Sequence, residues 1–235
     1  MKMIVNGAHG KMGRTLVQTL TQHPTHTLVA EVDKQDTLAH ILDQHAADVV
    51  IDFSHPQTRM EVVHTILSHR VSAVIGTSGF IEEDLQTIQQ WVETYQKGCL
   101  IAPNFIIGNV LMQQFAKKAA EYYEHVEIIE YHHDQKVDSP SGTAYKTAQL
   151  MAEARTAFNP NTRETVAHLE GARGANYRGI NIHSVRLPGF LASQEVLLGS
   201  PGEYLTLRHD NIDRQAYMPG VLKAAEYIHD HTALV

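Results

Sequence analysis

Residues 2–13 read KMIVNGAHGKMG, a short apolar run that leads into glycines at positions 7, 10 and 13. The run Lys2–Asn6 predicts a strand, and the residues that follow the glycines predict a helix. Glycines at such a turn let the backbone approach a pyrophosphate closely, and the helix N-terminus favours its negative charge. The spacing of these glycines is a variant of the usual dinucleotide fingerprint. Taken alone, it is explained equally well by a tight turn that binds no ligand.

An acidic residue at the next strand end strengthens the dinucleotide interpretation. Asp33 ends the predicted strand Thr27–Asp33, where a carboxylate would accept a hydrogen bond from the adenosine ribose. Lys34 follows directly and would attract a 2′-phosphate that Asp33 repels. We therefore expect both NADH and NADPH to serve as cofactors.

The first half of the chain alternates short β-branched runs with helical patterns, which is typical of βα units around a parallel sheet. Further strands are predicted at Asp48–Ser54, Val71–Thr77 and Cys99–Asn104. Ligands of such sheets bind beyond the carboxyl ends of the strands. The segments Gly76–Gly79 and Ala102–Phe105 are therefore either cofactor contacts or plain turns between strand and helix.

The second half predicts a different architecture, α+β. A strand in VEIIEYHH, a helix at about Thr143–Arg155 and a long polar loop over 158–179 precede three more strands, which we interpret as antiparallel. The C-terminal helix carries Val221, Ala225 and Ile228 on one face and should pack back on the first domain. The predicted domains are 1–106 completed by 216–235, and 107–215; the predicted strands of the second half are Ile180–Leu187, Glu195–Leu198 and Glu203–His209.

Composition excludes several classes of partner. The net charge of -7 and the pI of about 6.1 argue against nucleic acid or an anionic membrane surface. The sequence shows no long apolar segment, so we expect neither a membrane span nor a signal peptide. The single cysteine, Cys99, lies in an apolar run and is expected to be a buried thiol, which fits a cytoplasmic protein.

The most distinctive stretch, Glu130–Ala144, reads EYHHDQKVDSPSGTA. His132 and His133 end a predicted strand, so their side chains should point to opposite sides, which argues against a shared metal ion. An imidazole can give up a proton when hydride reaches a C=N or C=C bond, and Lys136 could hold a carboxylate or donate a proton.

The segment PSGT predicts a helix start with Ser141 near the cap, where Gly142 and Thr143 offer amides and a hydroxyl to a second anion. This combination predicts a small dicarboxylate substrate and no metal. The chain has 16 histidines, however, and most should be surface or core residues; we assign no role to His125, His168, His183 and His209.

Five stretches, GAHGKMG, IDFSHP, VIGTSGF, APNFIIGN and EYHHDQKVDSPSGTA, resemble in order the signatures of the 4-hydroxy-tetrahydrodipicolinate reductase (dihydrodipicolinate reductase) family. The resemblance implies reduction of a cyclic imine dicarboxylate, with loss of water, to tetrahydrodipicolinate in diaminopimelate and lysine biosynthesis. It also implies a Rossmann-like nucleotide-binding domain and a substrate domain whose mixed sheet builds a homotetramer. The small second domain leads to the same expectation, because its antiparallel strands leave an apolar face or edge to be covered.

Residue roles follow from the resemblance. His132 would be the proton donor or acceptor and Lys136 a proton donor, with His133, Gly142 and Thr143 as substrate contacts. The residues implied in cofactor binding are Gly7, Ala8, His9, Gly10, Lys11, Met12, Asp33, Lys34, Gly76, Thr77, Ser78, Ala102, Pro103, Asn104 and Phe105.

The chain departs from the family pattern at three places. Lys11 stands where the family often has Arg, which keeps the charge and removes a planar fork. His55 stands where a basic residue is frequent, and 192–194 replace a common Gly-Glu-His turn. Two other interpretations remain: a related dehydrogenase acting on aspartate or homoserine, which would not predict His132–Thr143, and a dinucleotide-sensing protein without turnover.

Overall fold

The computed structural model describes residues 1–160 and 168–235, and these form two compact units. The first unit comprises Met1–Ile106 and Arg214–Val235, and the second comprises Ile107–Asp213. Part of the long loop predicted over 158–179 falls on residues 161–167, outside the described residues.

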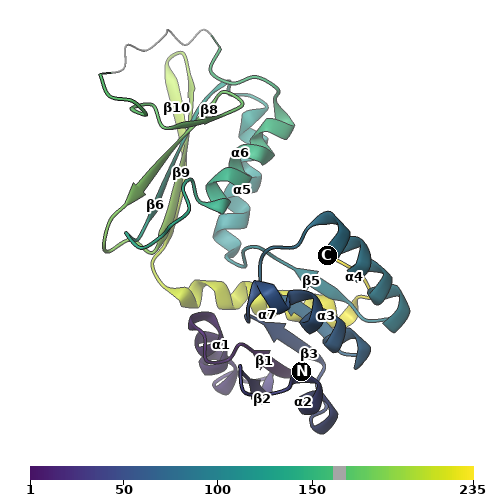
Figure 1. Cartoon of the computed structure of the whole chain (residues 1–235). Coiled ribbons are helices and arrows are strands. Elements are labelled where there is room, and N and C mark those ends of the chain that lie inside the picture. Colours follow the sequence, from purple (N-terminus) through teal and green to yellow (C-terminus); the bar gives the residue numbers. More distant parts are fainter. Residues whose placement is uncertain (161–167) are drawn as a thin grey trace. The chain divides into compact units, whose positions relative to one another are not determined.

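The first unit is built on a parallel sheet with the strand order β2-β1-β3-β4-β5 (Figure 1). The inner strands are apolar on both faces because helices cover both: Met3 and Val5 pack into one core, and Ile4 packs into the other. The strands are β1 (Lys2–Asn6), β2 (Thr27–Val32), β3 (Val49–Asp52), β4 (Ser72–Ile75) and β5 (Cys99–Ile101).

Five helices flank this sheet. The core on one face includes side chains of α1 (Lys11–Thr21) and α7 (Met218–Asp230), and the core on the other includes α2 (Leu38–Gln44), α3 (Arg59–Ser68) and α4 (Glu82–Tyr95). The predicted apolar face of the C-terminal helix is confirmed, because Val221, Ala225 and Ile228 are fully buried in the first unit. The end of the chain also pairs with β5, where the Cys99 amide donates to the Ala233 carbonyl at 2.9 Å.

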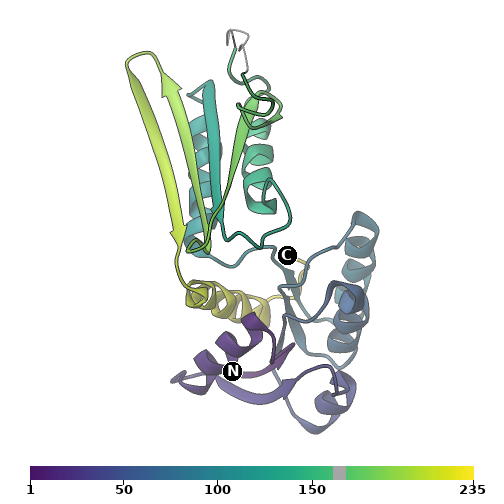
Figure 2. The same cartoon turned by 60° about the vertical axis from the view of Figure 1, so that its left-hand side comes forward.

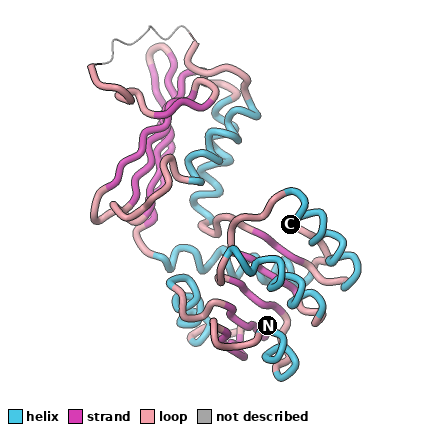
Figure 3. The backbone as a smooth tube through the Cα atoms, in the orientation of Figure 1, coloured by secondary structure: helices cyan, strands magenta, loops and turns pink. Residues whose placement is uncertain are grey.

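The second unit has a mixed sheet with the order β10-β9-β6-β8-β7. Figure 2 shows the long hairpin of β9 and β10 at its edge, and Figure 3 shows two helices along one face. The elements are α5 (Ile107–Ala120), β6 (His125–His132), α6 (Gly142–Ala154), β7 (Ala175–Tyr177), β8 (Ile180–Arg186), β9 (Ala192–Ser200) and β10 (Glu203–Asn211). A Rossmann-like unit followed by a mixed-sheet unit confirms the predicted fold class.

Three details correct the sequence-based picture of this unit. Strand β8 runs parallel to β6, so the strands after the loop are not all antiparallel. Parallel neighbours need a long crossover connection, and the chain between β6 and β8 provides one that contains α6. The predicted loop contains the short strand β7. Residues 192–194, where the family commonly has a turn, begin β9 and are paired with both neighbouring strands.

Helix α5 presents an apolar row to the outside. Leu111 and Phe115 of α5, and Tyr122 just beyond its end, are 46%, 57% and 72% exposed. The small residues Ala116 and Ala120 are buried against the sheet instead, because they let the helix approach it closely. The face of α5 with the larger apolar side chains is therefore exposed, and the face with the alanines packs into the core.

Candidate active site

The glycine turn after β1 is shaped for a close approach of a ligand. Gly7 has φ +77°, and a Cβ there would lie 2.6 Å from the Phe53 carbonyl oxygen. A Cβ on Gly13 would lie 2.1 Å from the Gly7 carbonyl oxygen, so the start of α1 can pack on the turn only with glycine. Gly10 caps α1 without a side-chain bond, and no acidic residue occupies the first turn. The cradle therefore fits a pyrophosphate at a helix N-terminus.

Asp33 lies beside this turn. Its carboxylate accepts from the backbone amides of His9 and Lys34, both at 2.8 Å. These two hydrogen bonds, with that of Lys34 the larger contributor, hold the pKa of Asp33 below its ordinary value. The carboxylate is thus ionised at neutral pH and suited to accept from a ribose hydroxyl, while the Lys34 side chain is exposed next to it.

A buried carboxylate that the sequence analysis missed ties the strand ends together. Asp52 at the end of β3 is 0% exposed and accepts from Asn6 Nδ2 at 2.7 Å and from Thr77 Oγ1 at 2.5 Å. The Thr77 hydroxyl, predicted to contact the cofactor, is therefore directed at Asp52, and its hydrogen bond holds the loop after β4 against the end of β3.

The remaining predicted cofactor residues differ in exposure. Phe105 is only 6% exposed and packs edge-on against Phe53, so its ring belongs to the core. Gly76 is also constrained by Phe53, whose ring lies 2.2 Å from a Cβ built at that position. The exposed or half-buried members are Gly7, His9, Gly10, Lys11, Met12, Asp33, Lys34, Gly76, Ser78, Ala102, Pro103 and Asn104, whereas Ala8 is buried.

In the second unit, His132 lies at the end of β6 with its side chain 13% exposed. Its Nδ1 lies 2.5 Å from Oε2 of Glu130, which is 0% exposed and precedes it by two residues on the same face of the strand. The other ring nitrogen, Nε2, is therefore the one left for a substrate. His133 follows the end of β6, and its carbonyl accepts from the Lys136 amide at 3.2 Å.

Glu130 is also bound by an arginine fork. Arg186 at the end of β8 donates from Nη2 to Oε1 at 2.7 Å and from Nη1 to Oε2 at 2.9 Å. Burial alone raises the pKa of Glu130, but the hydrogen bonds from His132, Arg186 and Ser184 outweigh burial and hold the pKa at about 2. The buried carboxyl is therefore an anion at neutral pH.

The loop after His132 and the start of α6 place several hydrogen-bond donors close together. Ser141 caps α6 as predicted, its Oγ accepting from the Ala144 amide at 3.2 Å, and α6 begins at Gly142. Lys136 Nζ donates to Asp138 at 2.7 Å, and this bond, with a smaller contribution from the Gly142 amide, lowers the pKa of Asp138. A carboxylate of the protein thus lies between the predicted lysine and the predicted helix amide.

His183 and two of the residues that depart from the family pattern, His55 and Gln194, have structural roles. His183 Nε2 binds Glu127 at 2.7 Å, and His55 Nδ1 accepts from the Gln57 amide at 3.3 Å to cap a short 3-10 helix. Gln194 Nε2 donates to Thr147 Oγ1 at 2.8 Å and braces α6 against β9. Within residues 1–160 and 168–235, no helix is long and apolar enough to cross a membrane, and no group of His, Cys, Asp or Glu could hold a metal ion.

The fold and the two sets of side chains are those expected of a nucleotide-dependent oxidoreductase. Residues 1–105 match the family described as dihydrodipicolinate reductase, N-terminus, and residues 108–235 match the corresponding C-terminus. The chain belongs to the dihydrodipicolinate reductase family. This membership confirms the predicted enzyme class, a 4-hydroxy-tetrahydrodipicolinate reductase of lysine and diaminopimelate biosynthesis.

Individual relatives agree over nearly the whole chain. The 4-hydroxy-tetrahydrodipicolinate reductase of Mycolicibacterium smegmatis is 48% identical, with 97% of this chain and 93% of that protein covered. The reductase of Listeria welshimeri is 45% identical, with 94% and 92% covered. The solved dihydrodipicolinate reductase of Paenisporosarcina sp. TG-14, bound to dipicolinate, has a TM-score of 0.93 and 41% identity, covering 100% of this chain and 97% of that one.

A dehydrogenase from Thermotoga maritima, 10% identical with a TM-score of 0.65, shares the fold alone over 97% of this chain and 89% of its own.

Proposed function

We propose that this chain reduces 4-hydroxy-tetrahydrodipicolinate to tetrahydrodipicolinate with NADH or NADPH, and that His132 delivers the proton. In the balanced reaction, substrate, NAD(P)H and one proton give tetrahydrodipicolinate, NAD(P)⁺ and water. The dinucleotide, when bound, supplies the hydride. The observation that carries the proposal is the His132 ring, held by a buried carboxylate beside an anion-binding helix start.

The hydrogen bonding of His132 suits a proton donor. Its Nδ1 is engaged by Glu130, so the proton would leave from Nε2 to the ring atom that gains electron density. A group that acts at that moment stabilises the transition state more than the bound substrate. Its loss should therefore lower kcat and affect KM little.

Lys136, Gly142 and Thr143 would hold the carboxylates. The Lys136 ammonium and the Gly142 amide already face a carboxylate in this structure, that of Asp138, whose side chain is 53% exposed. Asp138 thus marks where a substrate carboxylate could bind, and the substrate would displace it. The solved relative bound to dipicolinate, itself a dicarboxylate, supports this class of ligand.

In the first unit, the glycine turn would take the pyrophosphate and Asp33 the adenosine ribose. Because Asp33 is ionised it repels a 2′-phosphate, and the exposed Lys34 offsets that repulsion. Neither cofactor is strongly excluded by this pair. We place the reaction in the cytoplasm, where the lone buried thiol of Cys99 would remain reduced.

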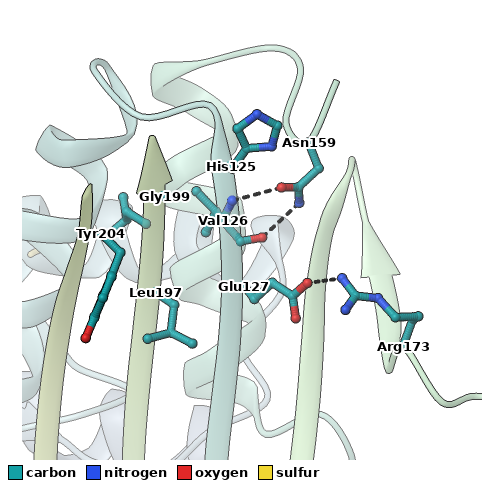
Figure 4. Close-up of a pocket in the computed structure, with 9 residues that line it drawn as sticks. His125, Val126, Glu127, Asn159, Arg173, Leu197, Gly199 and Tyr204 are labelled. Atoms are coloured by element: carbon teal, nitrogen blue, oxygen red, sulfur yellow. Dashed lines mark hydrogen bonds and ion pairs between the residues drawn. The ribbon is translucent and has the colours of Figure 1, made fainter. Parts of the chain in front are cut away.

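We propose further that the chain forms a homotetramer through its second unit. The sheet face opposite α5 and α6 carries a hollow of about 490 Å³ lined in part by Leu197, Gly199 and Tyr204 (Figure 4). Tyr204 is 80% exposed, and α5 adds its own apolar row. Exposed apolar side chains on both faces of the unit suit packing against another chain. Sedimentation should give four times 26.2 kDa, and a monomer at micromolar concentration would refute the assembly.

Two variants test the chemical roles in an assay that feeds the chain with the product of the preceding synthase. His132→Gln keeps hydrogen-bonding capacity and removes the titrating proton, so kcat should fall by about a hundredfold or more with KM little changed. Lys136→Ala should raise KM as well as lower kcat, because its ammonium meets a carboxylate in the ground state. Normal turnover by His132→Gln would remove the assignment of the donor.

A further inference from the structure

The buried pair of Glu130 and Arg186 connects three elements around the proposed proton donor. Glu130 Oε2 binds His132 on β6, while its Oε1 accepts from the Ser141 amide at the start of α6 at 3.2 Å. Arg186 reaches both oxygens from β8. We propose that Glu130, held by the Arg186 fork, is a positioning residue that fixes the tautomer and orientation of His132, so that Nε2 transfers the proton.

This inference rests on the proposed function, in which His132 is the donor. It assigns no contact with substrate to Glu130, which is 0% exposed. Its effect reaches the reaction through the imidazole.

The donors around the carboxylate fix the tautomer. Two guanidinium nitrogens and one backbone amide can only donate, and a carboxylate that carries no proton can only accept. The Ser184 hydroxyl also binds this carboxylate, and His132 Nδ1 at 2.5 Å must then donate as well. The form that transfers the proton is therefore the imidazolium, with Nδ1–H on Glu130 and the transferred proton on Nε2. After the transfer the neutral ring keeps its proton on Nδ1, and solvent can protonate Nε2 again.

The same carboxylate also fixes the spacing between the proton donor and the start of α6. Ser141 is tied to Glu130 through its amide, and its side chain caps α6 directly before Gly142. Arg186 Nη2 additionally donates to the Asp138 carbonyl at 2.8 Å, which anchors the loop between His133 and Ser141. Glu130 and Arg186 thus hold the imidazole ring and the proposed carboxylate contacts in one rigid cluster.

Glu127 provides a matched control on the same strand. Its carboxylate also binds a histidine, His183 at 2.7 Å, and an arginine, Arg173. It lies on the opposite face of β6, however, where Figure 4 shows it beside Arg173. Glu127→Gln removes the same charge from a similar trio without touching His132.

Glu130→Gln replaces one acceptor oxygen with an amide that can only donate. In either orientation this NH₂ group meets donors, and the orientation that spares Ser141 turns it toward His132. The ring then accepts at Nδ1 and carries its only proton on Nε2, so it cannot form the doubly protonated imidazolium that donates from Nε2. In a serine protease triad, the corresponding carboxylate-to-amide change lowers kcat by about 10⁴ through the wrong tautomer. We expect a loss of at least about a hundredfold here, with KM changed by less than about fivefold.

The experiment combines kinetics with the protonation state of one ring. Wild type, Glu130→Gln, Glu127→Gln and His132→Gln are assayed for kcat and KM with the synthase product and NADPH. The histidines are labelled with ¹⁵N, and solid-state NMR at neutral pH is recorded for each protein. The difference from the His132→Gln spectrum isolates the His132 ring.

We expect His132 to carry a proton on Nδ1 in wild type and in Glu127→Gln. In Glu130→Gln the proton should lie on Nε2 instead, and kcat should fall. If Glu130→Gln keeps the wild-type tautomer and turnover while His132→Gln is inactive, the positioning role is wrong and the proposed function stands. If His132→Gln turns over normally, the donor assignment itself fails.

A second variant covers the case in which Glu130→Gln does not fold. Glu130→Asp keeps a charge for Arg186 but withdraws the carboxylate from His132 by one methylene, so kcat should fall at least about tenfold at a near wild-type Tm. Wild-type kcat in Glu130→Asp would overturn the positioning role.

Discussion

Lowering the pH should test the ionised state of Glu130 through the stability of the protein. The folded pKa is about 2 against an ordinary value of 4.5, so the carboxylate contributes stability that is fully present above pH 4.5 and is lost as the pH falls toward 2. The whole difference corresponds to about 3 kcal/mol in favour of the folded state. From the same two pKa values, about 1 kcal/mol should be lost by pH 4 and about 2 kcal/mol by pH 3.

The assay is urea unfolding followed by circular dichroism at pH 7, 4 and 3 for wild type and Glu130→Gln. The variant lacks the titrating group, so its deficit relative to wild type should shrink by these amounts as the pH falls. Glu83→Gln, which replaces an exposed carboxylate of α4, serves as the control for the loss of one surface charge. A deficit of Glu130→Gln that stays constant from pH 7 to 3 would refute the ionised, hydrogen-bonded Glu130 described above.

Three further predictions concern single side chains. His133→Gln should lower kcat less than His132→Gln does, because neighbouring side chains of an extended chain point to opposite sides. The reverse order in steady-state kinetics would exchange their roles. Asp138→Asn should lower KM for the substrate by about two- to fivefold, because the internal carboxylate no longer competes for Lys136; an unchanged KM contradicts this competition. Lys34→Ala should weaken NADPH binding relative to NADH in calorimetric titration, and an unchanged ratio of Kd values removes the role of Lys34.

The fold of the first unit could be predicted because its signals are local. The run Lys2–Asn6, the glycines that follow and the strand-end Asp33 are each visible within a few residues, and parallel β-strands covered on both faces are apolar throughout. The strand direction of β8 was not predictable in this way, because a parallel partner is set by a crossover and leaves no local pattern.

The burial of Glu130 could have been predicted from the alternation of residues along β6. It shares the inward face of β6 with Val126 and Ile128, so its position predicts a buried carboxylate that needs a cation. Its partner Arg186 lies 56 residues later, and only the register of β6 with β8 brings the two together. Asp52 was missed for a similar reason, because its donors come from the ends of two other strands.

The most direct test of the account is the oxidation of NADPH by the purified chain, measured against the formation of tetrahydrodipicolinate. With the product of the preceding synthase present, one tetrahydrodipicolinate should form for each NADPH oxidised, and no NADPH should be oxidised with aspartate semialdehyde alone, the aldehyde whose reduction gives homoserine. Binding of NADPH without any oxidation, or oxidation that does not depend on the synthase product, would contradict the proposed reaction.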